Sequence, residues 1–407
     1  MGREYFILEC LTLLPKDAKL IIDSFTYLAV LVGLGGALMY IARNHDGRFF
    51  DYVPPIVLLY FGVMVLSTIG LWGKTPEINA SYNAVKSNLL PAMIFLMLLK
   101  SDLRQIRKLG KKMLIGFSAA SISIGLGFIV AFSLFQHLLE ENAWKTFAAL
   151  SGSWMGGTGN MAAIQSALNV PDSGMGYTLL IDSIDYAIWV VFLLALVPYA
   201  RFFNQWCGAD TSTIDSIGDR LQQEAPADTA ELDATNLLFL TGVAMLVSAL
   251  AQAFAADLPT TTFMTTTTWT VLIVTTVGVL AAMTKLGRLA GSAEIATVML
   301  YIIVALIASR ANFAELGQAP AYIVAGLIVL AVHGVCMVAV AKIFRLDLFT
   351  CGIASLANIG GVASAPILAA AYSRALIPIG VLMAMLGYIV GTAGGLLVGR
   401  ALSAIAS

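Results

Sequence analysis

Two glycine-rich stretches carry residue types that could bind a small molecule. The first covers residues 151–164 (SGSWMGGTGNMAAI), and the second covers residues 355–368 (SLANIGGVASAPIL). Glycine pairs let a helix unwind and let a ligand approach the backbone closely. At membrane depth, unwound backbone is tolerated only where protein or a water-filled cavity meets its hydrogen bonds. The two stretches therefore predict interrupted helices that face a binding site.

The two stretches also correspond to each other. Laid together without a gap, Ser151 meets Ser355, and the two glycine pairs coincide. Helix N-termini at such breaks offer N–H groups to an anion, and freed carbonyls suit a cation. We expect these residues to bind the substrate: Ser153, Gly156, Gly157, Thr158, Asn160, Asn358, Gly360, Gly361 and Ser364. The alternative is close helix packing by small residues, which does not require the hydroxyl and amide groups.

Two carboxylates follow the first glycine pair, in the stretch LIDSIDYAIW. Asp182 and Asp185 are spaced i,i+3 and share a helix face. A carboxylate in hydrocarbon costs several kcal/mol unless it is protonated or paired, so the pair predicts a site for a proton or a sodium ion. The alternative is a wetted helix end. Glu294 is a further ion-coupling candidate, and we expect no cofactor and no metal other than the coupling ion.

The composition indicates which elements must position these residues. Of 407 residues, 59% are hydrophobic and only 12% are charged, with a mean hydropathy of +0.87. Apolar runs of about 20 residues are long enough to cross a ~30 Å hydrocarbon core as helices. The sequence therefore predicts an all-α polytopic membrane protein. A net charge of −1 gives no reason to expect a nucleic-acid partner.

The apolar segments divide into two sets of six. They lie near 22–42, 53–73, 82–99, 112–137, 145–168 and 176–203, and then near 236–256, 266–284, 292–309, 318–342, 350–373 and 376–403. The gap between the sets is polar and acidic. We expect an N-terminal repeat at 1–203, an acidic linker at 204–235 and a C-terminal repeat at 236–407.

Charge in the loops predicts the topology. The most basic short loop, 100–112, should be cytoplasmic. If all twelve segments crossed, the loops with Lys285 and Lys342 would lie outside and the repeats would run parallel. Re-entrant hairpins at the fifth and eleventh segments would bring the basic loops inside and invert the repeats. One further membrane-crossing segment in the middle of the chain, not recognised from its hydropathy, would place the basic loops inside equally well. We favour inverted repeats and leave open whether the interrupted segments cross or re-enter.

These residues resemble a known family. SGSWMGGTGN, LIDSIDYAIW, SLANIGGVASAPILAAA and LGYIVGTAGG are similar to the bacterial domain-of-unknown-function family eight-one-nine. That family is grouped with the cation/proton antiporter and anion transporter superfamily. The grouping implies inverted repeats, a core domain with interrupted helices, a panel domain that often dimerises, and elevator-like movement. Asp182 and Asp185 occupy a place similar to the antiporter carboxylates, but they are not an adjacent Asp-Asp pair.

The sequence therefore predicts a secondary active transporter of a small polar or anionic organic solute, coupled to sodium or protons. The alternative is a monovalent cation/proton antiporter without an organic substrate. An enzyme is not expected, since both aspartates lie on one helix and the chain has no GxGD. The expected partners are the lipid bilayer, a small-molecule substrate and a second copy in a homodimer, at the bacterial inner membrane.

Overall fold

A computed structural model describes residues 21–45, 49–52, 54–209, 232–261, 264–313, 316–373 and 376–406. Within these ranges the regular elements are helices, and the β pairing is an isolated bridge between Ile21 and Trp72. The acidic linker predicted at 204–235 lies largely outside the described residues, from 210 to 231.

The helices of the first half follow the predicted segments. They are α2 (Ser24–Arg43), α3 (Phe49–Tyr52), α4 (Pro55–Thr68), α5 (Pro76–Leu98), α6 (Leu103–Ile106), α7 (Gly110–Phe135), α8 (Ala143–Gly156), α9 (Thr158–Leu168), α10 (Asp172–Leu196) and α11 (Ala200–Cys207). Short 3-10 turns stand at Arg107–Leu109, Gln136–Leu138 and Val197–Tyr199. The fifth predicted segment is thus two helices, α8 and α9, that divide at Gly157.

The helices of the second half also follow the predicted segments. Its helices are α13 (Ala234–Ala256), α14 (Thr266–Ala282), α15 (Ser292–Ala308), α16 (Ala319–Phe344), α17 (Leu348–Ile359), α18 (Gly361–Tyr372) and α19 (Ile377–Ala406), with a 3-10 turn at Lys285–Arg288. The eleventh predicted segment again divides at the glycine pair, between α17 and α18. Six described stretches are long and apolar enough to cross a membrane, which confirms an all-α polytopic membrane protein.

Capping side chains explain where several helices begin. Asp347 precedes α17, and its carboxylate accepts hydrogen bonds from the backbone N–H and the hydroxyl of Thr350. Thr265 precedes α14 and accepts from the backbone N–H of Thr268. Such side chains satisfy N–H groups that the first helical turn leaves without a partner. Each cap therefore fixes the residue at which an otherwise continuous apolar run becomes helical.

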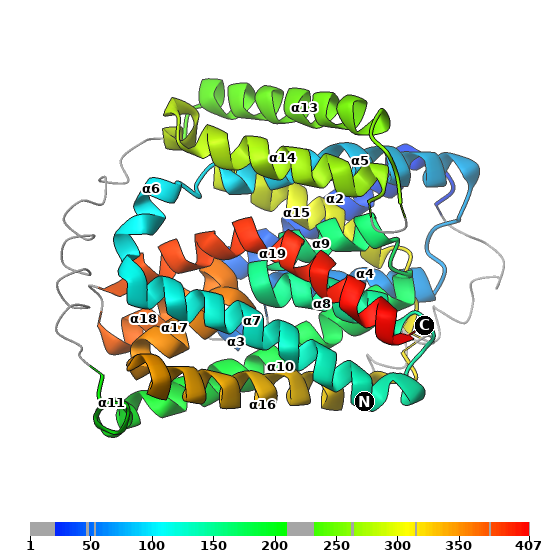
Figure 1. Cartoon of the computed structure of the whole chain (residues 1–407). Coiled ribbons are helices and arrows are strands. Elements are labelled where there is room, and N and C mark those ends of the chain that lie inside the picture. The colour runs from blue at the N-terminus through cyan, green and yellow to red at the C-terminus, as the bar shows by residue number, and fades with distance from the viewer. Residues whose placement is uncertain are drawn as a thin grey trace.

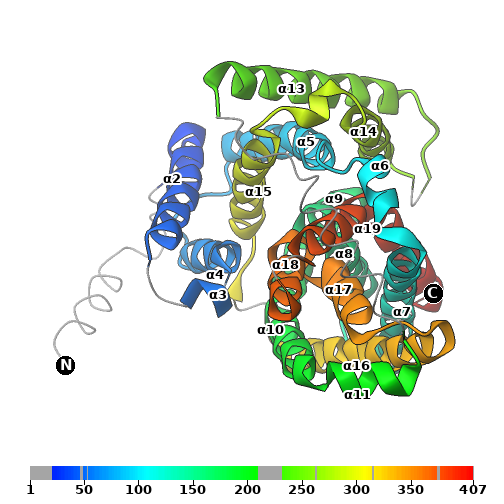
Figure 2. The ribbon, with the colours of Figure 1, turned by 90° about the vertical axis from the view of Figure 1, so that its left-hand side faces the viewer.

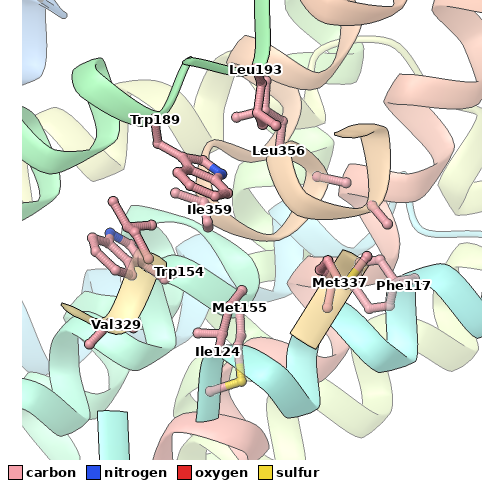
Figure 3. Close-up of a cluster of buried hydrophobic side chains, with 14 of the residues drawn as sticks. Phe117, Ile124, Trp154, Met155, Trp189, Leu193, Val329, Met337, Leu356 and Ile359 are labelled. Atoms are coloured by element: carbon pink, nitrogen blue, oxygen red, sulfur yellow. The ribbon is translucent and has the colours of Figure 1, made fainter. Parts of the chain in front are cut away.

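The helices form two groups, which Figure 2 shows apart from each other, one at the top and left and the other at the lower right. The panel group is α2, α4, α5, α13, α14 and α15. The hairpin group is α7–α10 and α16–α19. The buried apolar residues form two clusters. Phe117 and Val329 belong to the hairpin core, and Tyr27 and Ile303 belong to the panel core, which also takes in buried residues of α8, α9 and α10 such as Ile164. Figure 3 shows part of the hairpin core, where Trp154 and Val329 lie close together.

Glycines let α8 and α19 pack with their backbones almost in contact. A Cβ atom on Gly391 would lie 2.6 Å from the Cα atom of Gly156, and one on Gly395 would lie 3.0 Å from the Cα atom of Gly152. Small residues four positions apart permit this approach between membrane helices. The hairpin group is therefore held together at its centre by backbone contact.

The basic loops gather at one end of the helix bundle. Helices α6 and α11 both lie at this end, opposite the C-terminus (Figures 1 and 2). There Lys100 Nζ donates a hydrogen bond of 3.1 Å to the carbonyl of Leu289, and Lys342 Nζ donates to the carbonyl of Trp206. The loops that the positive-inside rule assigns to one side are thus joined by direct contacts.

Candidate functional site

Both interrupted segments fold back on themselves as helical hairpins. In the first, a Cβ atom on Gly152 of α8 would collide with the side chain of Ile164 of α9. In the second, a Cβ atom on Gly352 of α17 would lie 3.1 Å from Leu368 of α18. Residues 12 and 16 positions apart can meet in this way only if each pair of helices runs antiparallel. We call these pairs the first hairpin (α8–α9) and the second hairpin (α17–α18).

The glycines at the two tips have the backbone conformation that the breaks require. Gly157 has φ = +87°, and Gly361 has φ = +57°. Positive φ is unfavourable for residues with a Cβ atom and available to glycine. The sequence therefore breaks each helix at a residue that can reverse the chain.

The two hairpins enter from opposite ends, and their tips meet at one cavity. At the end with the basic loops, the backbone N–H of Leu348, at the start of α17, donates a hydrogen bond to Asn204 Oδ1. At the other end, the hydroxyl of Thr265 donates to the carbonyl of Ala167 in α9. The cavity has a volume of about 190 Å³. It is lined by Pro54, Ile56, Val57, Met97, Ser153, Gly157, Thr158, Gly159, Asp182, Ser183, Tyr186, Leu300, Ile359, Gly360, Gly361, Val362 and Tyr388. The lining thus combines both tips with panel helices.

Asp182 is the carboxylate of this cavity. Its Oδ1 atom accepts a hydrogen bond of 3.1 Å from the Ser153 hydroxyl and one of 3.0 Å from Trp154 Nε1. The side chain is half-buried, and its Oδ2 atom has no hydrogen-bond donor among the residues that the structure describes. Two donors fix the orientation of the carboxylate, which leaves one oxygen for a ligand in the cavity.

Asp185 lies elsewhere, although it is only three residues further along α10. It is fully buried, and neither carboxylate oxygen has a hydrogen-bond partner in the described part of the chain. It faces α16, where a Cβ atom on Gly326 would collide with its Oδ2 atom. The expectation of one shared carboxylate site therefore differs from the geometry, because the two side chains face different helices.

Glu294 is not brought to the cavity. It lies exposed in the first turn of α15, and Leu300 supplies the α15 contact with the cavity instead. Its proposed role in ion coupling has no geometric support.

The predicted substrate-binding residues separate into two sets. Ser153, Gly157, Thr158, Gly360 and Gly361 line the cavity. Four others lie behind the tips. Asn160 Nδ2 donates to the carbonyl of Gly156, and its Oδ1 accepts from Thr392 of α19. Asn358 Oδ1 accepts from Ser121 of α7, and Ser364 is buried beside Gly360. Asn160 and Asn358 thus hold the tips in place through hydrogen bonds, and none of the four residues is among those that line the cavity.

The sequence analysis missed several cavity residues. Tyr186 is one helical turn after Asp182, so the i,i+4 spacing could have identified it. Its ring lies against Gly360, and the ring of Tyr388 lies against Gly157, so each tip is covered by one tyrosine. The apolar panel residues Met97 and Leu300 carry no signal, because they stand among many similar residues in apolar helices.

Comparisons with known proteins support a membrane protein. The family model described as "Protein of unknown function (DUF819)" matches residues 29–405. The chain is also similar to a Bacillus subtilis (strain 168) protein described as "Uncharacterized membrane protein YjcL". The two are 26% identical over 361 residues, which cover 84% of this chain and 88% of the relative. With its apolar helices, the chain is a multi-pass membrane protein in contact with the lipid bilayer.

Proposed function

The chain belongs to the DUF819 family, and we propose that it is a secondary active transporter whose substrate site is the central cavity. The transporter is coupled to sodium or protons and carries a small polar or anionic organic solute. The observation that supports this is the cavity itself, since both hairpin tips and the Asp182 carboxylate line one space between the panel and hairpin groups. Transport, rather than an enzymatic reaction, is the function we propose.

The hairpin tips can contact both an anionic group and a cation. Helices α9 and α18 begin at the tips, and the first N–H groups of a helix have no intrahelical partner. Together with the positive end of the helix dipole, these groups suit an anionic part of a solute. The carbonyl ends of α8 and α17, with Asp182, suit a cation. A solute and a coupling ion can therefore be recognised within one cavity.

We propose that the two halves are inverted repeats, 1–203 and 236–407. The same order of helices in each half supports this, as do hairpins that enter from opposite ends. On this basis the end with the basic loops is cytoplasmic, and the membrane is the bacterial inner membrane. The panel group is then the surface that we expect to form a homodimer.

An elevator-like movement would carry the hairpin group along the panel group. At their boundary a Cβ atom on Gly159 would lie 2.6 Å from the sulfur of Met97. A small residue at the tip thus faces a flexible side chain of α5, and methionine adapts its shape readily. We propose that contacts of this kind let the boundary slide, whereas the close glycine contacts hold the hairpin group together as one unit.

A second function remains a candidate because of the charge in the cavity. Asp182 is a carboxylate, and among the lining residues there is no Lys or Arg. A monovalent cation/proton antiporter without an organic substrate would need little more than this carboxylate and the carbonyls at the tips. In that case no organic solute would bind, whereas cations and protons would compete for the Asp182 carboxylate.

Thermal unfolding of the purified protein tests the proposal. A cation that binds the folded state stabilises it by mass action, by about 2.7 kcal/mol at a hundredfold excess over Kd. We expect sodium or acid to shift the midpoint in the wild type and to lose this effect in Asp182→Asn. Glu294→Gln is the matched control, since Glu294 is exposed away from the cavity. An equal shift in Asp182→Asn, or no shift by any ion or solute in the wild type, would contradict the proposal.

A further inference from the structure

We propose that the solute carries an ammonium group, and that this group binds Asp182 in place of the coupling cation. The solute is a small zwitterion of the size of alanine, and it is exchanged for sodium or a proton. This inference rests on the proposed function and names the substrate class of the same cavity. The charges of the lining, the arrangement of Asp182 and the size of the cavity each support it.

The charges of the lining disfavour a purely anionic solute. Apart from tyrosines, Asp182 is the ionisable side chain in the cavity lining as the structure describes it. A carboxylate held beside Asp182 would be repelled, and no lining ammonium or guanidinium could offset this repulsion. A solute with its own ammonium group removes the conflict, because it brings the positive charge that the cavity lacks.

The surroundings of Asp182 fit an ammonium group. Ser153 and Trp154 donate to Oδ1, and these two bonds leave Oδ2 as the carboxylate oxygen that can bind a ligand. Tyr186 and Tyr388 line the same cavity, and each ring lies against one hairpin tip. A cation within about 6 Å of an aromatic ring centroid is attracted to the ring, so tyrosine rings in the lining suit a solute with an ammonium group. An ammonium group can thus be bound by one carboxylate oxygen and aromatic rings.

The opposite charge of the zwitterion has a partner at the tips. Thr158 and Gly361 begin α9 and α18 and line the cavity. The N–H groups of these first turns can donate to a carboxylate. The cavity has a volume of about 190 Å³, which is enough for a small solute such as alanine.

If the solute and the cation both bind the same oxygen of Asp182, each must weaken the binding of the other. An ammonium group, a sodium ion and a proton would occupy the same side of Asp182, so only one of them can bind at a time. Sodium and acid must then weaken solute binding, and by linkage the solute must weaken cation binding. A symporter with separate sites gives the reverse sign, since the cation there strengthens solute binding.

The test uses three probes with the full-length protein in detergent: alanine, propionate, which lacks the ammonium group, and ethylamine, which lacks the carboxylate. We expect alanine to bind most tightly, ethylamine more weakly, and propionate not at all. Once sodium is well above its own Kd, each tenfold increase should weaken alanine binding about tenfold. Asp182→Asn should lose the binding of alanine and of ethylamine, whereas Glu294→Gln should keep both.

Several results would overturn the inference that the solute is a zwitterion bound by Asp182. Propionate binding equal to alanine binding, alanine binding strengthened by sodium, or unchanged alanine binding in Asp182→Asn would overturn the inference. Absence of binding by all three probes would also overturn it, even if sodium still stabilises the wild type through Asp182. In those cases the transporter proposal stands. That proposal fails separately if neither sodium, acid nor any solute changes the stability of the wild type.

Discussion

Trp154 Nε1 donates a hydrogen bond of 3.0 Å to Oδ1 of Asp182, from the first hairpin to α10. The preceding residue, Ser153, donates to the same oxygen. Two consecutive residues of α8 therefore orient the carboxylate of the cavity. The position of the hairpin tip and the direction of the Asp182 side chain are fixed together, so a movement of one would change the other.

Trp154→Phe should weaken cation binding without closing the cavity. The change removes one of the two donors that orient Asp182, so that binding a cation must order the carboxylate; the value of such a hydrogen bond, about 1.5–3 kcal/mol, is the upper limit of the loss in binding free energy. The measurement is the sodium concentration that half-saturates the stability shift. Trp189→Phe is the matched control, because Trp189 Nε1 donates to Ser355 instead, 2.8 Å away. An equal loss in the control would mean that hairpin-core packing, and not the carboxylate, causes the effect.

Gly157→Val and Gly361→Val should each abolish ligand binding while the protein still inserts into the membrane. Both glycines have positive φ, which a β-branched residue adopts only with strain, and both line the cavity. The measurements are membrane yield and the sodium-dependent stability shift. Gly62→Val is the control, since nothing lies within 4 Å of a Cβ atom there. A normal shift in both tip variants would favour a role in packing alone.

Lys108 and Gln222 should be accessible from the same side of the membrane. Both lie in segments that we assign to the cytoplasm, and Asp257 should be accessible from the other side. Single cysteines at the three positions, in a variant without the native Cys10, Cys207, Cys336 and Cys351, can be labelled by an impermeant reagent. Labelling of positions 108 and 222 from opposite sides would exclude the inverted arrangement with two re-entrant hairpins.

Gly326→Ala should destabilise the protein because of Asp185. The added methyl group would collide with Asp185 Oδ2 and lie 2.5 Å from Ile181 Cγ2. Such overpacking costs about 1–3 kcal/mol. Asp185→Ala in the same chain should recover part of the loss, with a coupling energy of about 0.5–3 kcal/mol in a double-mutant cycle of thermal unfolding. Strict additivity of the two changes would show that the side chains do not touch.

Asp102 should make the start of α6 sensitive to acid. The side-chain hydrogen bond from Arg104 lowers the pKa of Asp102 below its ordinary value of 3.8, and the Arg104 backbone N–H contributes too. A lowered pKa in the folded state stabilises the fold above pH 3.8, and this contribution disappears as the pH falls through the lowered value. The protection of the Arg104 amide against hydrogen exchange, relative to an unstructured amide at the same pH, should fall there. In Asp102→Asn the protection of the same amide should not change with pH in this way.

Local signals in the sequence were enough to locate the helices and the breaks. Runs of about 20 apolar residues gave the helical segments, and the pairs at Gly157 and Gly361 gave the tips, because positive φ needs glycine. Ser153, Thr158 and Asp182 in the cavity were likewise recognisable as polar groups in apolar helices. These features depend on neighbouring residues, which the sequence displays directly.

Side-chain direction across helices could not be derived in the same way. The i,i+3 spacing of Asp182 and Asp185 predicts nearby side chains, yet a rotation of about 60° on the helix sends one to α8 and the other to α16. Asn160 and Asn358 were predicted to bind substrate, but they bond to α19 and α7. Tertiary packing decides which helix a polar side chain contacts. This information cannot be read from a single sequence.

The short arms of the hairpins have an electrical consequence. Helices α9 and α17 contain 11 and 12 residues, or about 17 and 18 Å, so each hairpin would reach only about halfway through the bilayer. The membrane voltage would then fall mainly across the thin layer of protein where the tips meet, around Asp182. Moving one net charge through this layer is worth about 2.3 kcal/mol per 100 mV. In an exchange of one proton for one zwitterion, that energy would sustain a concentration ratio of roughly fiftyfold.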